Sequence, residues 1–174
     1  MRSTLFHGLC RSAGVALGMA MGAAAAPAWA TPDALTVAAA CTPATRHTVE
    51  FGQVLTAEGA VRAGRNPPVM QYICPVWNPE DYAASTSWRF FRLQFRDANP
   101  GGAAVRATLF EKPRLAGRTE RLVVLVSAYS ADLAVVSAPL PRLLDFSRNA
   151  YYVLLELDPR TVAAEAHMLM LTDK

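Results

Sequence analysis

Apolar and polar residues alternate in short segments along most of the chain. The clearest segment is WRFFRLQFRD, residues 88–97, in which apolar and polar residues take turns. The apolar set is Phe91, Leu93 and Phe95, and the polar set is Arg92, Gln94 and Arg96. Because successive side chains of a strand point to opposite faces, this pattern predicts a β-strand with one face on a core and the other on water or a ligand.

Other segments of similar length have strand-like patterns, and glycine and proline residues separate them. We expect further strands in 47–57, 69–76, 103–113, 149–159 and 162–174. Segment 120–130 contains a continuous apolar run, Leu122 to Val126, which predicts a central strand covered on both faces. Segment 131–148 predicts a short strand followed by a loop or a helical turn.

The fold class follows from these segments. No stretch after residue 30 shows a sustained apolar stripe with the 3.6-residue period of a helix. About six to eight short strands separated by turns predict an all-β fold, a single antiparallel β-sandwich. A small β-barrel, open or closed, is the alternative.

Segments 88–97 and 103–113 are separated by ANPGG, a sequence typical of a turn. We expect them to form a hairpin in which the numbers of paired residues sum to 200, so that Phe95 lies opposite Val105. A slip of one residue would place Phe95 opposite Arg106 and would break the apolar face.

The predicted hairpin would gather Arg92, Arg96 and Arg106 on one outward face, with Gln94 beside them. Guanidinium groups repel one another unless an anion lies among them, and they bind carboxylate or phosphate in a bidentate manner. An anionic ligand is therefore one interpretation of this face. A solvated strand face, or ion pairs with acids elsewhere in the chain, is the other.

Four aromatic residues lie around the segment that follows Cys74: Tyr72, Trp77, Tyr82 and Trp88. Exposed rings on a β-sandwich can form a platform on which sugars stack, as in carbohydrate-binding modules. Ordinary packing in the core and loops is the alternative. We take Trp77, Tyr82 and Trp88 as candidate ligand-binding residues together with the arginine face.

Residues 1–30 have the organisation of a cleaved secretory signal. Arg2 and Arg11 lie in a basic region without acidic residues, and an apolar stretch, 12–26, follows and leads to APAWA. The apolar stretch is shorter than the about 20 residues that a membrane span needs. We therefore expect export to the periplasm or the outside, with a retained N-terminal anchor as the alternative.

The segment 31–46 is rich in Ala, Thr and Pro and predicts a flexible lead-in to a domain of residues 47–174. The whole chain has 17 basic and 14 acidic residues. Removal of Arg2 and Arg11 with the signal leaves 15 basic residues and a net charge of +1. That balance gives no reason to expect a nucleic acid or a membrane surface as the partner.

Cys41 and Cys74 remain after removal of the signal, and an even number of cysteines in an exported protein favours a disulfide. A thiol nucleophile would need a base, for which only His47 and His167 remain. The spacing of these four residues matches no zinc finger or ribbon. We expect the disulfide, with thiol chemistry, a metal site or two free thiols as the alternatives.

The sequence contains none of the common enzyme motifs for a nucleophile elbow, a zinc protease, a phosphate loop or a dinucleotide fold. Its organisation resembles that of small exported bacterial proteins with a signal, a disulfide and a β-sandwich. We expect a non-catalytic binding module without a metal or cofactor, whose ligand is a glycan or an anionic small molecule, or whose partner is another envelope protein. A small hydrolase using His47 or His167 and a structural envelope subunit joined through edge strands are the alternatives.

Overall fold

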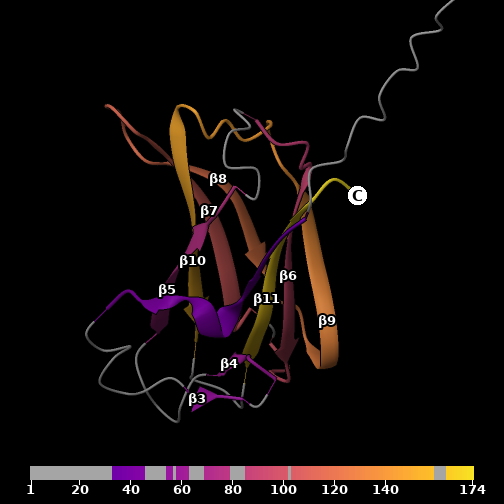
Figure 1. Ribbon diagram of the computed structural model, residues 1–174. Helices are drawn as coiled ribbons and strands as arrows, with labels where there is room; N and C mark the ends of the chain where they lie inside the picture. The colour runs from indigo at the N-terminus through magenta and orange to yellow at the C-terminus, as the bar shows by residue number, and fades with distance from the viewer. Residues whose placement is uncertain are drawn as a thin grey trace, which may run out of the picture.

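The computed structural model describes residues 33–45, 54–56, 58–62, 69–78, 85–101, 103–158 and 164–174. These residues form two antiparallel sheets packed face to face, so the predicted all-β sandwich is confirmed. Figure 1 shows β5, β10 and β7 in one sheet beside β11, β6 and β9 in the other. No ladder joins the sheets among the described strands, so the alternative of a barrel is wrong. The expected signal peptide lies outside the described residues.

The first sheet, sheet A, runs in the order β3-β4-β11-β6-β9, with β1 paired to β11. Its strands are β1 (Ala34–Val37), β3 (Val54–Leu55), β4 (Val61–Arg62), β6 (Phe90–Asp97), β9 (Ser130–Pro139) and β11 (Glu165–Thr172). β4 pairs with the first residues of β11 and β1 with its later residues, so these two strands follow one another along the same edge.

The second sheet, sheet B, runs in the order β2-β5-β10-β7-β8. Its strands are β2 (Thr42–Pro43), β5 (Met70–Val76), β7 (Val105–Pro113), β8 (Glu120–Val126) and β10 (Asn149–Leu157). A link after β6 and a link after β8 both carry the chain from one sheet to the other.

The core lies between the sheets and consists of alternate residues of the strands. Phe91, Leu93 and Phe95 of β6 are buried, as their spacing predicts. β10 contributes its own alternate set, which was also expected on one face: Tyr151, Val153, Leu155 and Leu157. Periodicity therefore identified the inward face of both strands correctly.

The predicted hairpin of 88–97 and 103–113 is wrong. Both segments form strands, but β6 pairs with β11 and β9 in sheet A, whereas β7 pairs with β10 and β8 in sheet B. An alternating pattern defines which face of a strand is buried but not which strand lies beside it. The link between β6 and β7 crosses the sandwich instead of turning back within one sheet.

The Asp97 carboxylate, which is fully buried at the end of β6, organises this crossing. The Ala104 N–H and the Ser127 hydroxyl donate to its Oδ2 at 3.0 and 2.5 Å, and the Asn99 N–H donates to its Oδ1 at 3.1 Å. The Ser127 Oγ also accepts from the Val105 N–H at 3.0 Å. Because Ser127 follows β8, one side chain network holds both links between the sheets.

Two other strand predictions need correction. β8 lies at the edge of sheet B, and only Val123 and Leu125 of its apolar run are buried, while Val124 and Val126 are exposed. The segment Leu122 to Val126 has apolar side chains on both faces of the strand, but only the face toward the core is buried. The segment 131–148 contains most of β9, a longer strand than expected, and then the expected loop, in which the Asn149 N–H donates to the Asp145 oxygen at 3.1 Å across a turn at 146–148.

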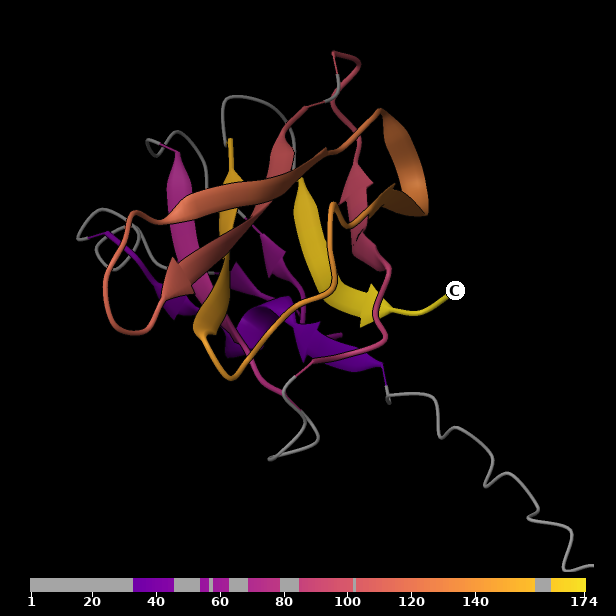
Figure 2. The same cartoon turned by 90° about the horizontal axis from the view of Figure 1, so that it is seen from above.

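The N-terminal segment belongs to the fold rather than leading to it. The 3₁₀ turn Ala38–Ala40 links β1 in sheet A to β2 in sheet B. Figure 2 shows this indigo segment on one side of the sandwich and the link from β8 to β9 on the opposite side. Of the expected first strand, 47–57, only the short β3 is a strand among the described residues, and 46–53 lie outside them.

The predicted disulfide between Cys41 and Cys74 is confirmed, and it spans 33 residues of sequence. It ties the N-terminal crossing to the inward face of β5. Such a bond is consistent with an oxidising environment. In the described part of the chain, no helix has the length and apolarity that crossing a bilayer would require.

The loop after β9 closes one end of the core. Its Phe146 packs edge-on against the buried Trp88, at 6.1 Å between ring centroids, and lies 4.8 Å from the Tyr151 ring. The Tyr151 hydroxyl accepts from the Asp145 N–H at 2.8 Å, and burial raises the pKa of that hydroxyl. Hydrogen bonds to the Ser147 hydroxyl and N–H lower the pKa of the Asp145 carboxyl.

We expect the Cys41→Ser/Cys74→Ser variant to lose about 3–4 kcal/mol of unfolding free energy, because a bond across 33 residues restricts the unfolded chain. Urea denaturation of the variant and the wild type measures the loss. Wild-type protein treated with dithiothreitol should unfold at the midpoint of the variant. A loss below about 1 kcal/mol would contradict the stabilising role of the bond.

We expect Asp97→Asn to lower the unfolding free energy by about 2–3 kcal/mol, because an amide cannot accept all the hydrogen bonds that converge on the carboxylate. Asp132→Asn is the control, since Asp132 is exposed in β9, and it should change stability by less than about 0.5 kcal/mol. Equal midpoints for the two variants in urea would show that the network does not hold the links.

Candidate functional site

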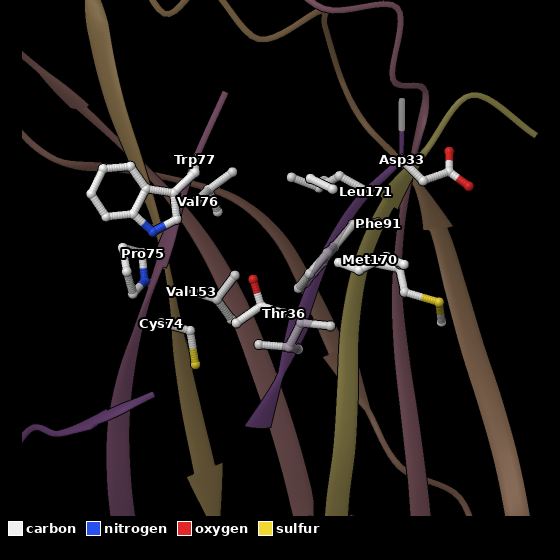
Figure 3. Close-up of a pocket in the computed structure, with 13 residues that line it drawn as sticks. Asp33, Thr36, Cys74, Pro75, Val76, Trp77, Phe91, Val153, Met170 and Leu171 are labelled. Carbon is white, nitrogen blue, oxygen red and sulfur yellow. The ribbon is translucent and has the colours of Figure 1, made fainter. Parts of the chain in front are cut away.

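A pocket of about 290 Å³ opens between the sheets on the side that the N-terminal segment covers. β1 and β11 form its wall in sheet A, and β5 and β10 form its wall in sheet B. Figure 3 shows Thr36 projecting from β1 into the space next to Val153 of β10. The pocket is near the lower end of the range of volumes found for small-molecule sites.

Small residues of β1 leave this space open. Ala34 pairs with Leu171, and Thr36 pairs with Leu169, so Ala34 and Thr36 lie on the inward side of sheet A beside two buried leucines. Across the space, Cys74 and Val76 of β5 line the other wall. An alanine and a threonine fill less of the inter-sheet layer than the leucines beside them. A hollow therefore remains where β1 faces β5.

An exposed tryptophan lies beside the pocket, and Figure 3 shows its ring pointing away from the space between the sheets. Trp77, which follows β5, lines the pocket and has 75% of its surface exposed. The Asp33 carboxylate also lies at the pocket, but Figure 3 shows it and the Met170 side chain pointing away from the space between the sheets. The interior that remains is apolar apart from the Thr36 hydroxyl. Such a lining suits an apolar group and offers little to a charged one.

The edge of β5 beside the pocket is only partly covered. β2 pairs with Tyr72 and Ile73, and the Ala44 N–H donates to the Gln71 oxygen at 2.8 Å. Backbone groups of alternate residues point to the same edge, so Pro75 also turns its nitrogen to this edge. Proline has no N–H. A strand that paired with β5 at this edge would therefore find no backbone donor at Pro75.

The arginines that we expected on one face lie on opposite faces of the molecule. Arg92, Gln94 and Arg96 are on the outer face of sheet A, whereas Arg106 is on the outer face of sheet B. The shared anion-binding face depended on the hairpin, and the crossing at Asp97 separates its two halves. The binding role of these residues individually stays a prediction.

Each arginine of β6 has a partner within the described residues. Arg96 Nη1 lies 3.1 Å from Glu165 Oε2, and Arg92 Nη2 donates to the backbone oxygen of Lys174. Arg92 also lies over the Phe90 ring. Arg106 is exposed and faces Glu156 on β10 across the ladder. Ion pairs of this kind correspond to the alternative that we stated for the arginine face.

The expected aromatic platform is not assembled from the residues that were chosen for it. Trp88 and Tyr72 are fully buried, so neither ring is free to stack on a sugar, and Tyr82 lies outside the described residues. Burial raises the pKa of Tyr72 to about 12. Among the described members of the group, Trp77 alone is exposed, and it stands at the pocket.

A cluster of charged residues surrounds Glu165 at the start of β11, and we call it the Glu165 cluster. Its members are Glu165, Arg96, Arg62, His167 and Glu58. His167 is buried and its Nε2 lies 3.2 Å from Glu165 Oε2. The ladder to β6 shifts register between Ala166 and Met168, so a bulge at His167 brings this side chain back toward Glu165.

This cluster bears on the hydrolase alternative. His167 and Glu165 could act as a base and its orienting carboxylate, but Arg96 and Arg62 already pair with the same carboxylate at 3.1 and 3.9 Å. No serine or cysteine accompanies them in the cluster. His47 lies outside the described residues. Within the described ranges, no group of three or more His, Cys, Asp or Glu side chains is placed to hold a metal ion.

Sequence reasoning did not find the pocket or the Glu165 cluster. The pocket depends on the small side chains of Ala34 and Thr36, which face β5. These residues belong to β1, which lies in a segment that we expected to be a flexible lead-in. The pair Glu165 and His167 did carry a signal, because residues two apart in a strand share a face. Their partners, Arg62 and Arg96, come from other strands and could not be assigned without the sheet order.

No family model matches this chain, and none of the curated proteins matches it in sequence.

We expect Glu165→Gln to lower the unfolding free energy by about 1–2 kcal/mol, because it removes the charge shared by two arginines and the histidine. Glu58→Gln is the matched control, since the Glu58 side chain is 70% exposed, and it should change stability by less than about 0.5 kcal/mol. Thermal and urea unfolding at neutral pH measure both. If Glu58→Gln lowered the unfolding free energy as much as Glu165→Gln does, burial of the carboxylate would not determine how much these ion pairs stabilise the fold.

Proposed function

We propose that this protein is an exported binding module whose inter-sheet pocket holds a small apolar group, such as an alkyl chain or a hydrocarbon ring. The observation that carries the proposal is the apolar pocket between the sheets, beside which the exposed Trp77 lies. A concave and mostly apolar hollow is the usual form of a small-molecule site.

The export part of this proposal rests on the N-terminal sequence and on the disulfide. Residues 1–30 have the pattern of a secretory signal, and the Cys41–Cys74 bond is consistent with an oxidising compartment. The periplasm and the outside of the cell both fit these features. The proposed site therefore works in a place where free apolar compounds and lipid fragments would reach it from solution.

The structure favours an apolar ligand over the glycan or anionic ligand that the sequence suggested. Arg106 lies on a different sheet from Arg92 and Arg96, and Trp88 is buried, so neither expected surface is assembled as predicted. The pocket lining offers burial of apolar surface as its main source of affinity. A buried methylene contributes about 0.8 kcal/mol, so full burial of an eight-carbon chain sets a lower limit of about 0.02 mM on its dissociation constant.

The proposal is tested by titrating the purified chain from Thr31 onward with octanol, octanoate, glucose and sulfate while Trp77 emission is recorded. Octanol and octanoate should shift the emission saturably and with similar affinity, because the alkyl chain supplies the binding energy. Glucose and sulfate should have no effect. Trp77→Phe should abolish the signal, since Trp88 is buried against Phe146 and remote from the lining of the pocket.

Two alanine variants make the test specific to the pocket. Ala34→Leu fills part of the hollow and should weaken binding of octanol at least about tenfold, which corresponds to 1.4 kcal/mol. Ala150→Leu makes the same change at an exposed position of β10 and should bind as the wild type does. Saturable binding of glucose or sulfate alone, or equal binding by both variants, would overturn the proposal.

A further inference from the structure

The outer edge of β9 is a long strand edge without a partner in the described part of the chain. β9 spans Ser130–Pro139 and is the last strand of sheet A (Figure 1). Asp132 is its one charged residue. Leu133 and Val135 are 47% and 53% exposed. A long, apolar and nearly uncharged edge is a template for pairing with another strand.

The backbone groups available at this edge can be identified from the ladder to β6. The Leu140 N–H donates to the Arg89 oxygen at 2.7 Å, just beyond the pair of Phe90 and Pro139. Even-numbered residues of β9 therefore turn their backbone groups to β6, and odd-numbered residues turn theirs outward. Within the described ranges, Val135 and Ser137 each present an unpaired backbone donor and an unpaired backbone acceptor at this edge. The nitrogen of Pro139 faces outward, where it needs no partner.

Other edges of the sandwich carry features that discourage pairing. β8 begins with Glu120 and Arg121, and its ladder to β7 shifts register between Leu109 and Phe110. β5 is partly covered by β2 and presents Pro75 beyond it. Charges, bulges and prolines are the means by which proteins protect sheet edges. From Ala134 to Ala138, β9 has none of them, and the register shift in its own ladder to β6 lies between Ser130 and Ala134.

We propose that β9 pairs in antiparallel fashion with β9 of a second copy of this chain, and that the two sheets A become one continuous sheet. A pairing that uses the outward backbone groups and centres on Val135 has residue numbers that sum to 270. Val135 then lies opposite Val135 of the partner copy, and Leu133 lies opposite Ser137. In this register the strand pairs with an identical strand about a two-fold axis at Val135, which is the symmetry of a homodimer.

Charges agree with a second copy as the occupant. In this register Asp132 lies opposite Ala138, so the two Asp132 side chains do not face each other. The central row across the joined sheet is Gln94, Val135 and the same two residues of the partner, all uncharged. Arg92 of one copy and Arg96 of the other are separated by about three strand spacings, or roughly 14 Å, which exceeds the screening length at physiological salt.

Pairing would also cover side chains that the monomer leaves half-buried. Ala134, Val136 and Ala138 point to the inner side of sheet A, where they pack against the core only in part. In the joined sheet Val136 would lie opposite Ala134 of the partner, and both would lose exposure to water. This interface is independent of the pocket, which lies on the opposite side of the sandwich between β1 and β5.

The first test is sedimentation of the purified chain from Thr31 onward over a range of concentrations. The wild type should form a dimer whose fraction rises with concentration. Val135→Lys places two ammonium groups opposite each other at the two-fold axis and should weaken the dimer by at least about tenfold. Val124→Lys makes the same change at an exposed position of β8 and should leave the dimer intact. A wild type that stays monomeric at all concentrations would overturn the proposal.

The register has its own readout in disulfide trapping. Val135→Cys should give an intermolecular disulfide on mild oxidation, because directly opposed residues of an antiparallel pair have Cβ atoms about 4.5–5.5 Å apart. Leu133→Cys and Ser137→Cys should cross-link when mixed and much less when each is alone. Val124→Cys is the control and should remain a monomer under oxidation. A dimer that Val135→Lys does not weaken, or that Val135→Cys does not trap, would show that another surface joins the copies.

Discussion

The carboxylate of Asp97 is the constraint on which the arrangement of the two sheets depends. It lies fully buried at the end of β6 and accepts hydrogen bonds from Asn99 and Ala104, near the two ends of the link to β7, and from Ser127 after β8. A buried carboxylate is costly unless donors surround it, so the backbone must stay where those donors converge. The chain passes from sheet A to sheet B and back again at this one place.

The disulfide performs the corresponding task on the other side of the sandwich. Cys41 follows the turn after β1, and Cys74 lies in β5, so the bond fixes the passage from β1 in sheet A to β2 in sheet B. One side of the molecule is therefore held by a polar network and the other by a covalent link. The pocket lies beside the covalent link, where small β1 residues meet the wall of sheet B.

The sequence was sufficient to predict the class of fold, the disulfide and the buried faces of β6 and β10. Alternation placed Phe91, Leu93 and Phe95 inward because burial on one face is a local property of a strand. Strand order is not local. ANPGG resembles a hairpin turn, yet the chain crosses there, because the Asp97 hydrogen bonds involve Ser127, thirty residues away in the sequence.

The predicted grouping of the candidate site residues was wrong for the same reason. Arg92 and Arg106 were grouped through an assumed pairing, and Trp88 was grouped with Trp77 because they are near in sequence. Trp88 instead packs on Phe146, from a loop that closes the end of the core. The pocket needed the position of β1, and its short alternating pattern, ALTV, is too brief to distinguish a strand from a lead-in.

The position of the disulfide connects the pocket to the redox state of its surroundings. Cys74 lines the pocket, and its bond to Cys41 sets how far the wall formed by β1 stands from the wall formed by β5. A ligand that prefers the bonded arrangement must, by thermodynamic reciprocity, make the bond harder to reduce by the same factor. Occupancy and oxidation would then protect each other, and a chain still in a reducing compartment would be a poorer receptor than the same chain after oxidation.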